Sequence, residues 1–512
     1  MQSLSQPSDF PISHKWIMYT RLRTNQIILE NAILYLLFAI LIYTPVFGFL
    51  TTLPIRIWDE SRLAINAYEM YKNGNLWITF FDGQPDLWNT KPPFLIWMQA
   101  ALMHLLGVNE VAVRLPSAMA CFITCLSIII FMHRFFSSVW PGFIAVIVLI
   151  SMRGYINTHA TRTGDYDAML TLFTTLYCLL FFAFLQSGKI IYLYGFFINL
   201  SLAFLTKSTA SLLFLPGLAA YSIINGSFRH LIRNRHTWIA FIICLMPILG
   251  FYLIRESLNP GYLSAVVKNE WGGRFLSTIE NHDHSSFYYF DNFIDFQLKE
   301  WYIFVPAGIV TGLLSNDKKL ASLALFILVI VFAYFILISL SQTKLEWYDV
   351  PMYPFIAIFI AFFIWIVANI LKNTSAVTDH LNSKLVPALL CFFICLGPYR
   401  NIVHKTYKPE EYAWDKEFYE IGYYLKKGIK AEVGLNHTKL LYDGYNAQIK
   451  FYIHILQDKG IDIQLSSWDD LHIGDIVIAH QQYVKGYIAD HYKNIVLYTS
   501  GQINNYLILG RQ

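Results

Sequence analysis

A series of long apolar runs, separated by short polar segments, constrains this chain more than any other feature of its sequence. We interpret eleven of these runs as spanning helices, since about 20 apolar residues in a helix cross a hydrocarbon core of about 30 Å. They are residues 30–50, 114–132, 138–153, 167–186, 190–205, 208–225, 237–255, 301–315, 319–341, 353–371 and 385–398. Only 14% of the residues are charged, against about 25% in soluble domains. We therefore predict an α-helical, polytopic membrane protein.

One further apolar run, 92–107, is shorter. It opens with two prolines, which suit the start of a helix, and closes at Gly107, which suits a helix end. The 14 residues between them would give about 21 Å of helix, too short for a core of about 30 Å. We therefore expect this run to form a helix lying in the membrane interface.

Basic residues between the runs indicate how the spans are oriented. With eleven spans, the basic N-terminal tail and the later Lys- and Arg-bearing loops fall on one side of the membrane, as the positive-inside rule requires. These residues are Lys15, Arg21, Arg23, Arg134, Lys189, Arg229, Arg233, Arg235, Lys318, Lys319, Lys372 and Lys384. The N-terminus is then expected in the cytoplasm, and the segments that face outward are 51–113, 154–166, 256–300 and 342–352.

The chain after residue 398 follows a different pattern, because charged residues return and the apolar runs shorten to strand length. Residues 412–430 have a helical pattern. The short runs that we interpret as strands are 439–444, 449–455, 475–480, 494–500 and 506–510. The sequence thus predicts two domains, a transmembrane domain over 1–398 and a small extracytoplasmic α/β domain over 399–512.

Residues 58–93 hold the densest polar chemistry in the front half of the chain. Residues 60–73 alternate apolar and polar side chains with a helical period, which predicts an amphipathic helix. Asp59 would cap this helix and Glu60 would favour its positive end. A carboxylate at this outer boundary could also act as a general base on a hydroxyl group. The two interpretations are compatible.

Further charged residues stand where outer segments meet predicted spans. Asp165 and Asp167 lie where an outer loop enters a span, and helix capping is the simpler interpretation for both. Lys91 precedes two prolines, which hold its backbone extended. A lysine held there suits an anionic headgroup, and a snorkelling side chain is the alternative. For Lys207, between two closely spaced runs, snorkelling is the simpler interpretation.

The outer segment 256–300 brings Arg274, His282 and His284 together with aromatic residues. An arginine in such surroundings suits phosphate binding. The two histidines would need metal ligands from elsewhere. All six cysteines lie inside apolar runs, where they are expected to be small buried residues. The sequence therefore identifies no certain cofactor, and a divalent metal stays an open alternative.

The last outer loop, 341–354, contains two prolines and carries Lys344, Glu346, Tyr348 and Asp349. On local pattern alone most of these are solvated loop residues. By the predicted topology they lie on the same side of the membrane as the other polar segments.

In their order along the chain, these motifs resemble those of the GT-C glycosyltransferases. Within that class they are similar to the dolichyl-phosphate-mannose–protein mannosyltransferase family and to the lipid A aminoarabinose transferases. The matching stretches are Asp59-Glu60, Lys91-Pro92-Pro93, Gly107 with Asn109 and Arg114, Asp167-Ala168-Met169-Leu170, 205–208 with Pro216, Arg274-Phe275 with 287–289, and 344–351. The resemblance covers about residues 56–354 and is specific because these motifs occur in the same order.

The resemblance implies an inverting transfer of a sugar from a polyprenyl-phosphate carrier to a lipid, glycan or protein acceptor. Asp59 would be the base or positioning carboxylate on the acceptor side, with Glu60 beside it, and Asp167 would support the sugar or the acceptor. The residues that would hold the donor phosphate are Lys91, Arg274, Tyr348 and Lys344.

The residues expected to support this site are Arg62, Asp165, Lys207, His282 and His284. In the aminoarabinose transferases a Glu and a His bind metal at positions that are Thr90 and Trp271 here. No metal is therefore predicted at that place. The resemblance implies an integral protein of the inner or plasma membrane, with its active site facing the periplasm or exterior.

Two other functions remain as alternatives. A transporter or flippase of polyprenyl lipids would place ionisable groups near the bilayer midplane, whereas the spans here are largely uncharged and the acids lie in outer loops. A binder of lipid-linked sugars without catalytic activity is equally compatible with the sequence. The net charge of +4 is too small and dispersed to indicate a nucleic-acid partner.

Overall fold

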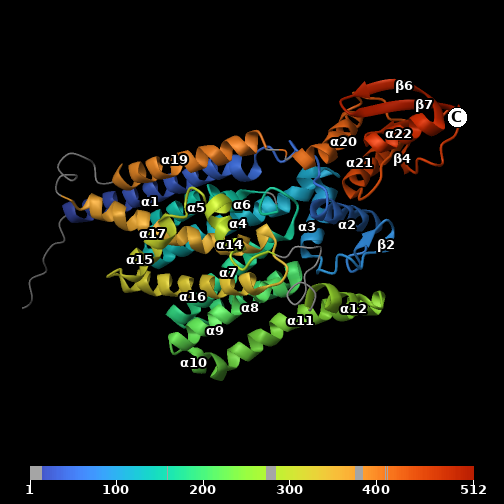
Figure 1. Cartoon of the computed structure of the whole chain (residues 1–512). Coiled ribbons are helices and arrows are strands. Elements are labelled where there is room, and N and C mark those ends of the chain that lie inside the picture. The colour runs from blue at the N-terminus through green and yellow to red at the C-terminus, as the bar shows by residue number, and fades with distance from the viewer. Residues whose placement is uncertain (1–13, 158, 272–283, 375–384, 410, 412) are drawn as a thin grey trace, which may run out of the picture.

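The computed structural model describes residues 14–157, 159–271, 284–374, 385–409, 411 and 413–512 (Figure 1). Eight helices in this part of the chain are long and apolar enough to cross a membrane. Most of their residues belong to α1 (His14–Ile42), α4 (Glu110–Phe136), α7 (Tyr166–Ser187), α8 (Ile190–Lys207), α11 (Arg235–Leu258), α16 (Lys318–Leu340), α17 (Tyr353–Lys372) and α19 (Leu385–Tyr407). The predicted class, a helical polytopic membrane protein with a small C-terminal α/β part, is confirmed.

Each of these eight helices falls on one of the predicted spans. The other three predicted spans correspond to shorter apolar helices, α5 (Trp140–Ile150), α9 (Leu215–Ile224) and α15 (Phe304–Leu313). The run that we assigned to the interface forms another short helix, α3 (Phe94–Leu106).

Close packing explains why short α5 and α15 lie within the bundle. Every residue from Pro141 to Ile150 in α5 is buried. A Cβ on Gly142 would come within 2.7 Å of the Cα of Ile129 in α4, and one on Gly308 in α15 would come within 2.1 Å of a carbonyl oxygen in α17. Small residues allow such close approach of helices in membranes, so these two glycines fix the core around α5 and α17.

Several short elements lie at one end of the bundle (Figure 1). The helix α2 (Asp59–Asn73) buries its apolar side chains and packs against α3, and it ends at Gly74 in the left-handed conformation. The predicted amphipathic helix is thus confirmed. The small strands β1 (Phe80–Phe81) and β2 (Gln84–Pro85) follow it as an antiparallel pair.

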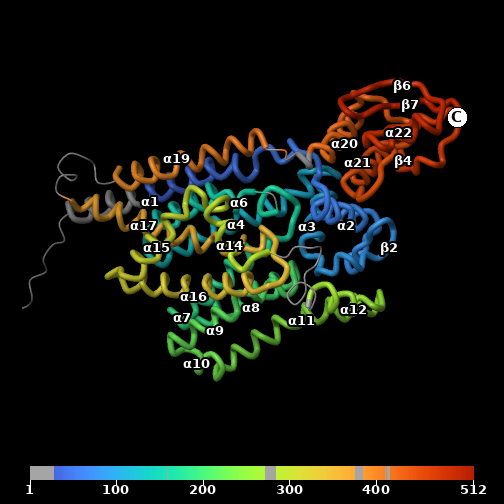
Figure 2. Tube along the Cα trace, viewed as in Figure 1, coloured from blue at the N-terminus to red at the C-terminus, as the bar shows by residue number. Residues whose placement is uncertain are grey.

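The remaining short helices connect the longer ones. They are η1 (Tyr43–Phe47), α6 (Arg153–Ile156), η2 (Ser208–Leu212), α10 (Phe228–Arg233), α12 (Tyr262–Val266), η3 (Val267–Trp271), α14 (Tyr288–Asn292), η4 (Phe293–Gln297) and η5 (Glu346–Met352). The Cα trace shows α19 running alongside α1 (Figure 2), and the Tyr399 hydroxyl donates a hydrogen bond to the carbonyl of Leu41 there.

The C-terminal region carries a five-stranded sheet in the order β4-β3-β5-β7-β6. The strands are β3 (Thr438–Leu441), β4 (Ile463–Ser466), β5 (Ile476–Ala479), β6 (Tyr492–Ser500) and β7 (Ile503–Arg511). β3 pairs in parallel with β4 and β5, while β7 is antiparallel to β5 and β6. The accompanying helices are α20 (Ala413–Ile429), α21 (Ala447–Asp458) and α22 (Gln482–His491).

One predicted strand is wrong, because residues 449–455 belong to the helix α21. This run is apolar almost throughout, and its side chains are buried on more than one face of the helix. A continuous apolar run of that length has no periodicity that separates a buried strand from a buried helix.

Candidate active site

A cleft lies where α2, the loop before α3, the start of α7, the end of α8 and η5 meet. Its charged, amide and tyrosine lining residues come from five separate segments of the chain and are Asp59, Arg62, Asn89, Lys91, Asp165, Tyr166, Asp167, Lys207 and Tyr348. Seven of these nine residues were singled out from the sequence; Asn89 and Tyr166 were not. The structure therefore brings together residues that lie up to 289 positions apart, from 59 to 348.

Asp59 is the first residue of α2, and its side chain is 41% exposed. Trp58 precedes it with φ 70° and ψ −118°, and no side chain caps the helix there. The interpretation of Asp59 as the helix cap is therefore wrong. A non-glycine residue at such positive φ is strained, and such strain is often found at functional sites. The strained turn at Trp58 leaves the Asp59 carboxylate facing the cleft.

Glu60, the residue after Asp59, is buried inside the protein, whereas Asp59 is exposed to the cleft. Its buried carboxylate accepts hydrogen bonds from the Arg114 guanidinium at 2.7 and 2.9 Å and from the backbone amides of Arg56 and Gly164. Burial opposes ionisation, but the Arg114 charge and these hydrogen bonds hold the pKa of Glu60 below its ordinary value. The structure thus places Glu60 in an internal ion pair rather than in the cleft, which corrects its assignment to the catalytic group.

Arg62, one turn into α2, forms a two-pronged ion pair with Asp86 at 2.9 and 2.7 Å. Asn66 also donates to Asp86, and the Arg62 guanidinium lies over the ring of Phe81. Burial opposes ionisation of Asp86, but the hydrogen bonds and charge of Arg62 lower its pKa. The pair fixes the loop that leads to Lys91, so the supporting role expected for Arg62 is mechanically reasonable.

Lys91 faces Glu270, with its Nζ 3.3 Å from a carboxylate oxygen, and its side chain is 13% exposed. The ring of Tyr166 lies 5.8 Å from the same nitrogen. The Tyr262 hydroxyl donates to the backbone carbonyl of Thr90, just before it. Lys91 is therefore held in the cleft by fixed neighbours and does not snorkel into water.

Asp167 and Lys207 form a second buried pair, with 2.5 Å between the Nζ and a carboxylate oxygen. Lys207 points into the protein, so its interpretation as a snorkelling residue is wrong. Its ammonium group lies 5.6 Å from the centre of the Tyr348 ring. The pair therefore links the start of α7 to the end of α8 directly beside the cleft.

The sequence interpretation missed His159. Its Nδ1 lies 3.2 Å from Asp165 and 4.0 Å from Asp59, and its ring stacks on Trp347 at 3.7 Å. Asp165 also accepts a hydrogen bond from Thr163 at 2.6 Å. Possible ligand atoms of Asp59, His159 and Asp165 lie within 4.8 Å of one another. This group could hold a divalent cation, and without one the imidazole lies between two carboxylates. A single histidine in a loop gives no sequence signal for either arrangement.

A cavity of about 370 Å³ adjoins the cleft. Its polar end is formed by Lys91, Asp167, Lys207, Glu270 and Tyr348, while its other walls are mainly aliphatic. The aliphatic residues are Leu170, Ala210, Leu213, Leu337 and Ile338. Its shape and chemistry suit an amphipathic ligand with an anionic headgroup.

The other residues singled out from the sequence lie elsewhere. Lys344 is buried and donates to the carbonyl of Ser341 at 2.7 Å, and it is not among the residues that line this cavity. His284 stacks on Tyr288, outside the residues that line the cleft. Arg274 and His282 lie outside the described residues.

Comparison with known structures identifies the fold. ArnT from Cupriavidus metallidurans bound to undecaprenyl phosphate superposes with a TM-score of 0.68, at 14% identity and over 96% of this chain and 100% of that one. The oligosaccharyltransferase of Archaeoglobus fulgidus gives a TM-score of 0.53 at 10% identity, over 94% of this chain and 74% of that one. The chain thus has the fold of the GT-C glycosyltransferases and is an integral membrane protein.

Sequence comparison agrees with the fold. Residues 90–253 match the dolichyl-phosphate-mannose-protein mannosyltransferase family. An uncharacterized protein of Aquifex aeolicus (strain VF5) is 23% identical over 314 residues, which make up 60% of each chain, so this chain spans 60% of the length of that relative. The resemblance inferred from the motifs is therefore confirmed.

Proposed function

We propose that this protein is an inverting glycosyltransferase that takes a sugar from a polyprenyl-phosphate carrier. The observation that carries the proposal is the convergence of Lys91, Lys207 and Tyr348 at the polar end of an aliphatic cavity. The aliphatic walls would take the polyprenyl chain, and Lys91 and Lys207 at the polar end would bind its phosphate. The likeness to ArnT, whose structure contains undecaprenyl phosphate, supports this class of donor.

In the proposed reaction, an acceptor hydroxyl attacks the anomeric carbon of the sugar on the face opposite the phosphate. A bond forms between that carbon and the acceptor oxygen, and the bond between the carbon and the phosphate oxygen breaks. The phosphate leaves with the electron pair as polyprenyl phosphate, and Asp59 takes the hydroxyl proton. Asp59 suits this role because it lines the same cleft as Lys91 and is accessible there.

Lys91 and Lys207 would stabilise the negative charge that builds on the leaving phosphate. Each already lies close to a carboxylate, Glu270 or Asp167, so neither has to be reoriented when the donor arrives. Asp167 would keep Lys207 in place beside the sugar. Arg274, which the resemblance assigns to the same phosphate, stays part of the proposal without a structural argument.

The side of the membrane is also a proposal. The distribution of basic loops supports an outward-facing cleft and an extracytoplasmic C-terminal domain over 399–512. The inner or plasma membrane is the location that the resemblance to the GT-C glycosyltransferases implies. The acceptor would then be a lipid, glycan or protein on that face.

Donor binding tests the proposal directly. Undecaprenyl phosphate is titrated against the purified protein, against Lys91→Ala, and against Lys189→Ala as a control in an exposed position between α7 and α8. We expect Lys91→Ala to weaken binding at least roughly tenfold, the scale of a lost hydrogen bond to a charged group, and Lys189→Ala to bind normally. Equal binding by all three proteins would refute the donor site. Normal binding without sugar transfer to any acceptor would indicate a non-catalytic binder.

A further inference from the structure

A groove of about 330 Å³ lies between α4, α7 and α8, at the ends of these helices that point away from the cleft. Asp167, in the first turn of α7, lines the cleft, whereas Ser187, the last residue of α7, lines the groove. The 20 positions from 167 to 187 span about 30 Å of helix, which is the thickness of a hydrocarbon core. The groove and the cleft therefore belong to opposite leaflets of the membrane.

The walls of the groove are mainly apolar. The apolar lining residues include Ile130, Phe131 and Phe135 of α4 and Leu176, Leu179, Leu180 and Ala183 of α7. Ile130 is 37% exposed, so the groove opens on the outer surface of the bundle. From Leu176 to Ser187, α7 runs about 16 Å, close to half of the hydrocarbon core. The groove thus has the length of one acyl chain in a single leaflet.

The polar end of the groove is cationic. Arg134 lies there, in the last turn of α4, and it is exposed and forms no ion pair or side-chain hydrogen bond with the described residues. The Nζ of Lys319 in α16 lies nearby, 3.4 Å from the carbonyl oxygen of Phe135 and 5.8 Å from the centre of its ring. Asp317 caps α16 by accepting a hydrogen bond from the Lys319 backbone amide. No Asp or Glu is among the described residues that line the groove.

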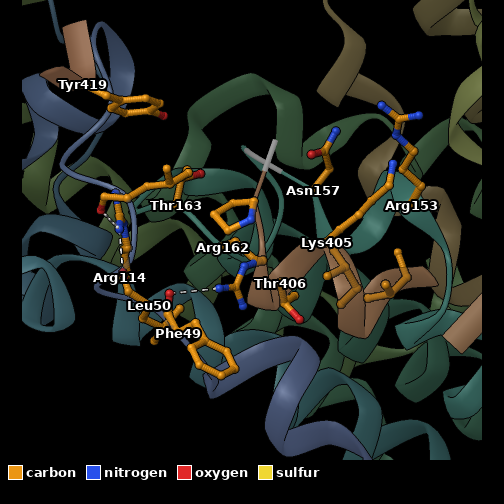
Figure 3. A pocket seen from close by; sticks show the side chains of 14 residues that line it. Phe49, Leu50, Arg114, Arg153, Asn157, Arg162, Thr163, Lys405, Thr406 and Tyr419 are labelled. Atoms are coloured by element: carbon orange, nitrogen blue, oxygen red, sulfur yellow. Dashed lines mark hydrogen bonds between the residues drawn. The ribbon is translucent and has the colours of Figure 1, made fainter. Parts of the chain in front are cut away.

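Two arginines around a different cavity already have close partners (Figure 3). There Arg114 donates to the Glu60 carboxylate, and Arg162 donates to the backbone carbonyls of Gly48 and Phe49. Arg134 differs from both, because it is exposed at the end of an apolar groove. A cation in that position suits a ligand that joins an anionic headgroup to an apolar chain.

We propose that this groove binds an anionic glycerophospholipid, with its phosphate at Arg134 and Lys319 and one acyl chain lying along α7. In the proposed orientation this end of the bundle faces the cytoplasm, where the leaflet carries anionic lipids. The long chain of a polyprenyl carrier would extend well beyond a groove of this length. The bound phospholipid would join α4, α7 and α8, whose other ends carry Arg114, Asp167 and Lys207. It would therefore stabilise the helices around the cleft without taking part in sugar transfer.

Lipid binding to the detergent-solubilised protein tests this proposal. The probes are phosphatidylglycerol, phosphatidylcholine with the same acyl chains, and glycerol 3-phosphate, which is an anionic headgroup without chains. Native mass spectrometry measures the bound molecules. We expect phosphatidylglycerol to bind at least roughly tenfold more tightly than phosphatidylcholine, the scale of a hydrogen bond to a charged group, and glycerol 3-phosphate to bind too weakly for detection. Equal binding of the two lipids, or equally tight binding of glycerol 3-phosphate, would overturn the proposal.

Three variants separate the headgroup from the chain. Arg134→Gln removes the cation and should reduce phosphatidylglycerol binding to the level of phosphatidylcholine. Ala183→Phe fills the apolar part of the groove and should weaken the binding of both lipids. Arg229→Gln, at an exposed arginine of α10 that does not line the groove, is the matched control and should keep the preference. An equal loss in this control would show that general surface charge attracts the lipid, and would overturn the site.

Two further measurements locate the bound lipid. Lys91→Ala should keep the preference for phosphatidylglycerol, whereas its loss there would place this lipid in the donor cavity and refute the groove. Phosphatidylglycerol should raise the thermal unfolding midpoint of the wild-type protein but not of Arg134→Gln, because a ligand that binds only the folded state stabilises it. The same rise in both proteins would contradict a site at Arg134. Neither measurement depends on sugar transfer, so both test the groove even if the proposed function fails.

Discussion

The two sides of the cleft are built on opposite principles. On the donor side each lysine has a nearby carboxylate, Glu270 for Lys91 and Asp167 for Lys207. On the other side, the cavity that shares Trp347 with the cleft is lined by Asn292 and Gln297, which have side-chain atoms without hydrogen-bond partners among the described residues. Fixed ion pairs suit a task in which charge appears only as the leaving group departs. Open polar groups suit recognition of a ligand that brings its own hydroxyls and charge.

This contrast leads to different kinetic expectations for the two sides. Changes on the donor side should lower turnover at any acceptor concentration, since they act on the departing phosphate. Changes on this second side, where the acceptor would enter, should raise the KM for the acceptor with a smaller effect on kcat. Asp59 stands between the two sides and should affect turnover most strongly.

The largest effect is expected for Asp59→Asn, which keeps the size of the side chain and removes its charge. With a hydroxyl acceptor, kcat should fall about 10²- to 10⁴-fold, the usual contribution of a positioned general base. Donor binding should persist. Sugar transfer from the lipid-linked donor, measured at saturating acceptor, gives the rate.

Glu69→Gln on the same helix, whose carboxylate accepts hydrogen bonds from the Gly83 amide, is the matched control and should retain normal turnover. Near-normal turnover in Asp59→Asn would show that Asp59 is not the base. Asp167 would then be the next carboxylate to test, and an already ionised phosphate acceptor would become the better explanation.

Lys91→Ala should have the next largest effect, because it removes a cation from the leaving phosphate. We expect kcat to fall roughly 10²- to 10³-fold, the scale of a lost oxyanion donor, with an unchanged KM for the acceptor. Steady-state kinetics with varied acceptor measure this. A rise in acceptor KM with normal kcat would show that Lys91 acts on the acceptor. The proposed difference between the two sides of the cleft would then be wrong.

The apolar runs and the order of motifs predicted much of this arrangement. The runs located the helices, and the outer positions of Asp59, Lys91, Asp167 and Tyr348 placed them at one cleft, as observed. Local sequence could not show which member of the Asp59-Glu60 pair faces the cleft. That depends on Arg114, which is 54 residues away.

The acceptor side was less visible in the sequence. His159, Asn292 and Gln297 are single polar residues without a motif around them, and their relevance depends on a cavity formed by distant segments. A polar residue is informative when it is buried and unpaired, and neither property can be read from a local pattern. The same limit explains the error at 449–455, where burial on several faces removed the helical period.

Glu60→Gln should reduce stability rather than turnover, since the ion pair of Glu60 with Arg114 joins α2 to α4 inside the protein. Removing one partner of a buried ion pair costs roughly 3 kcal/mol, measured as a lower free energy of unfolding in detergent. The pKa of Glu60 is lowered in the folded protein. Its contribution to stability is therefore present above the ordinary pKa of a glutamate and is lost as the pH falls through the lower, folded value.

The variant should accordingly lack this part of the acid sensitivity of the wild-type protein. Donor binding should be normal in the fraction that folds. An unchanged unfolding free energy at neutral pH, together with a large loss of kcat, would return Glu60 to the catalytic group and contradict its assignment to an internal ion pair.

The smallest effect concerns how the C-terminal region supports Asp59. Tyr445 stacks on Trp58 with 4.6 Å between ring centres, and its hydroxyl donates to the Trp58 carbonyl at 3.2 Å. These contacts hold the strained turn that directs Asp59 into the cleft. Tyr445→Ala should therefore lower kcat roughly tenfold, since a misplaced base is less effective, and leave the KM for both substrates nearly unchanged.

Tyr445→Phe keeps the stacking and should recover most of the activity, and Tyr483→Ala, at an exposed tyrosine of the same region, should behave as wild type. A positioning role also requires Tyr445→Ala to lose little further activity when combined with Asp59→Asn, because both changes act on the same carboxylate. Fully additive losses would instead show that Tyr445 acts elsewhere, and that the two sides of the cleft work independently of the C-terminal region.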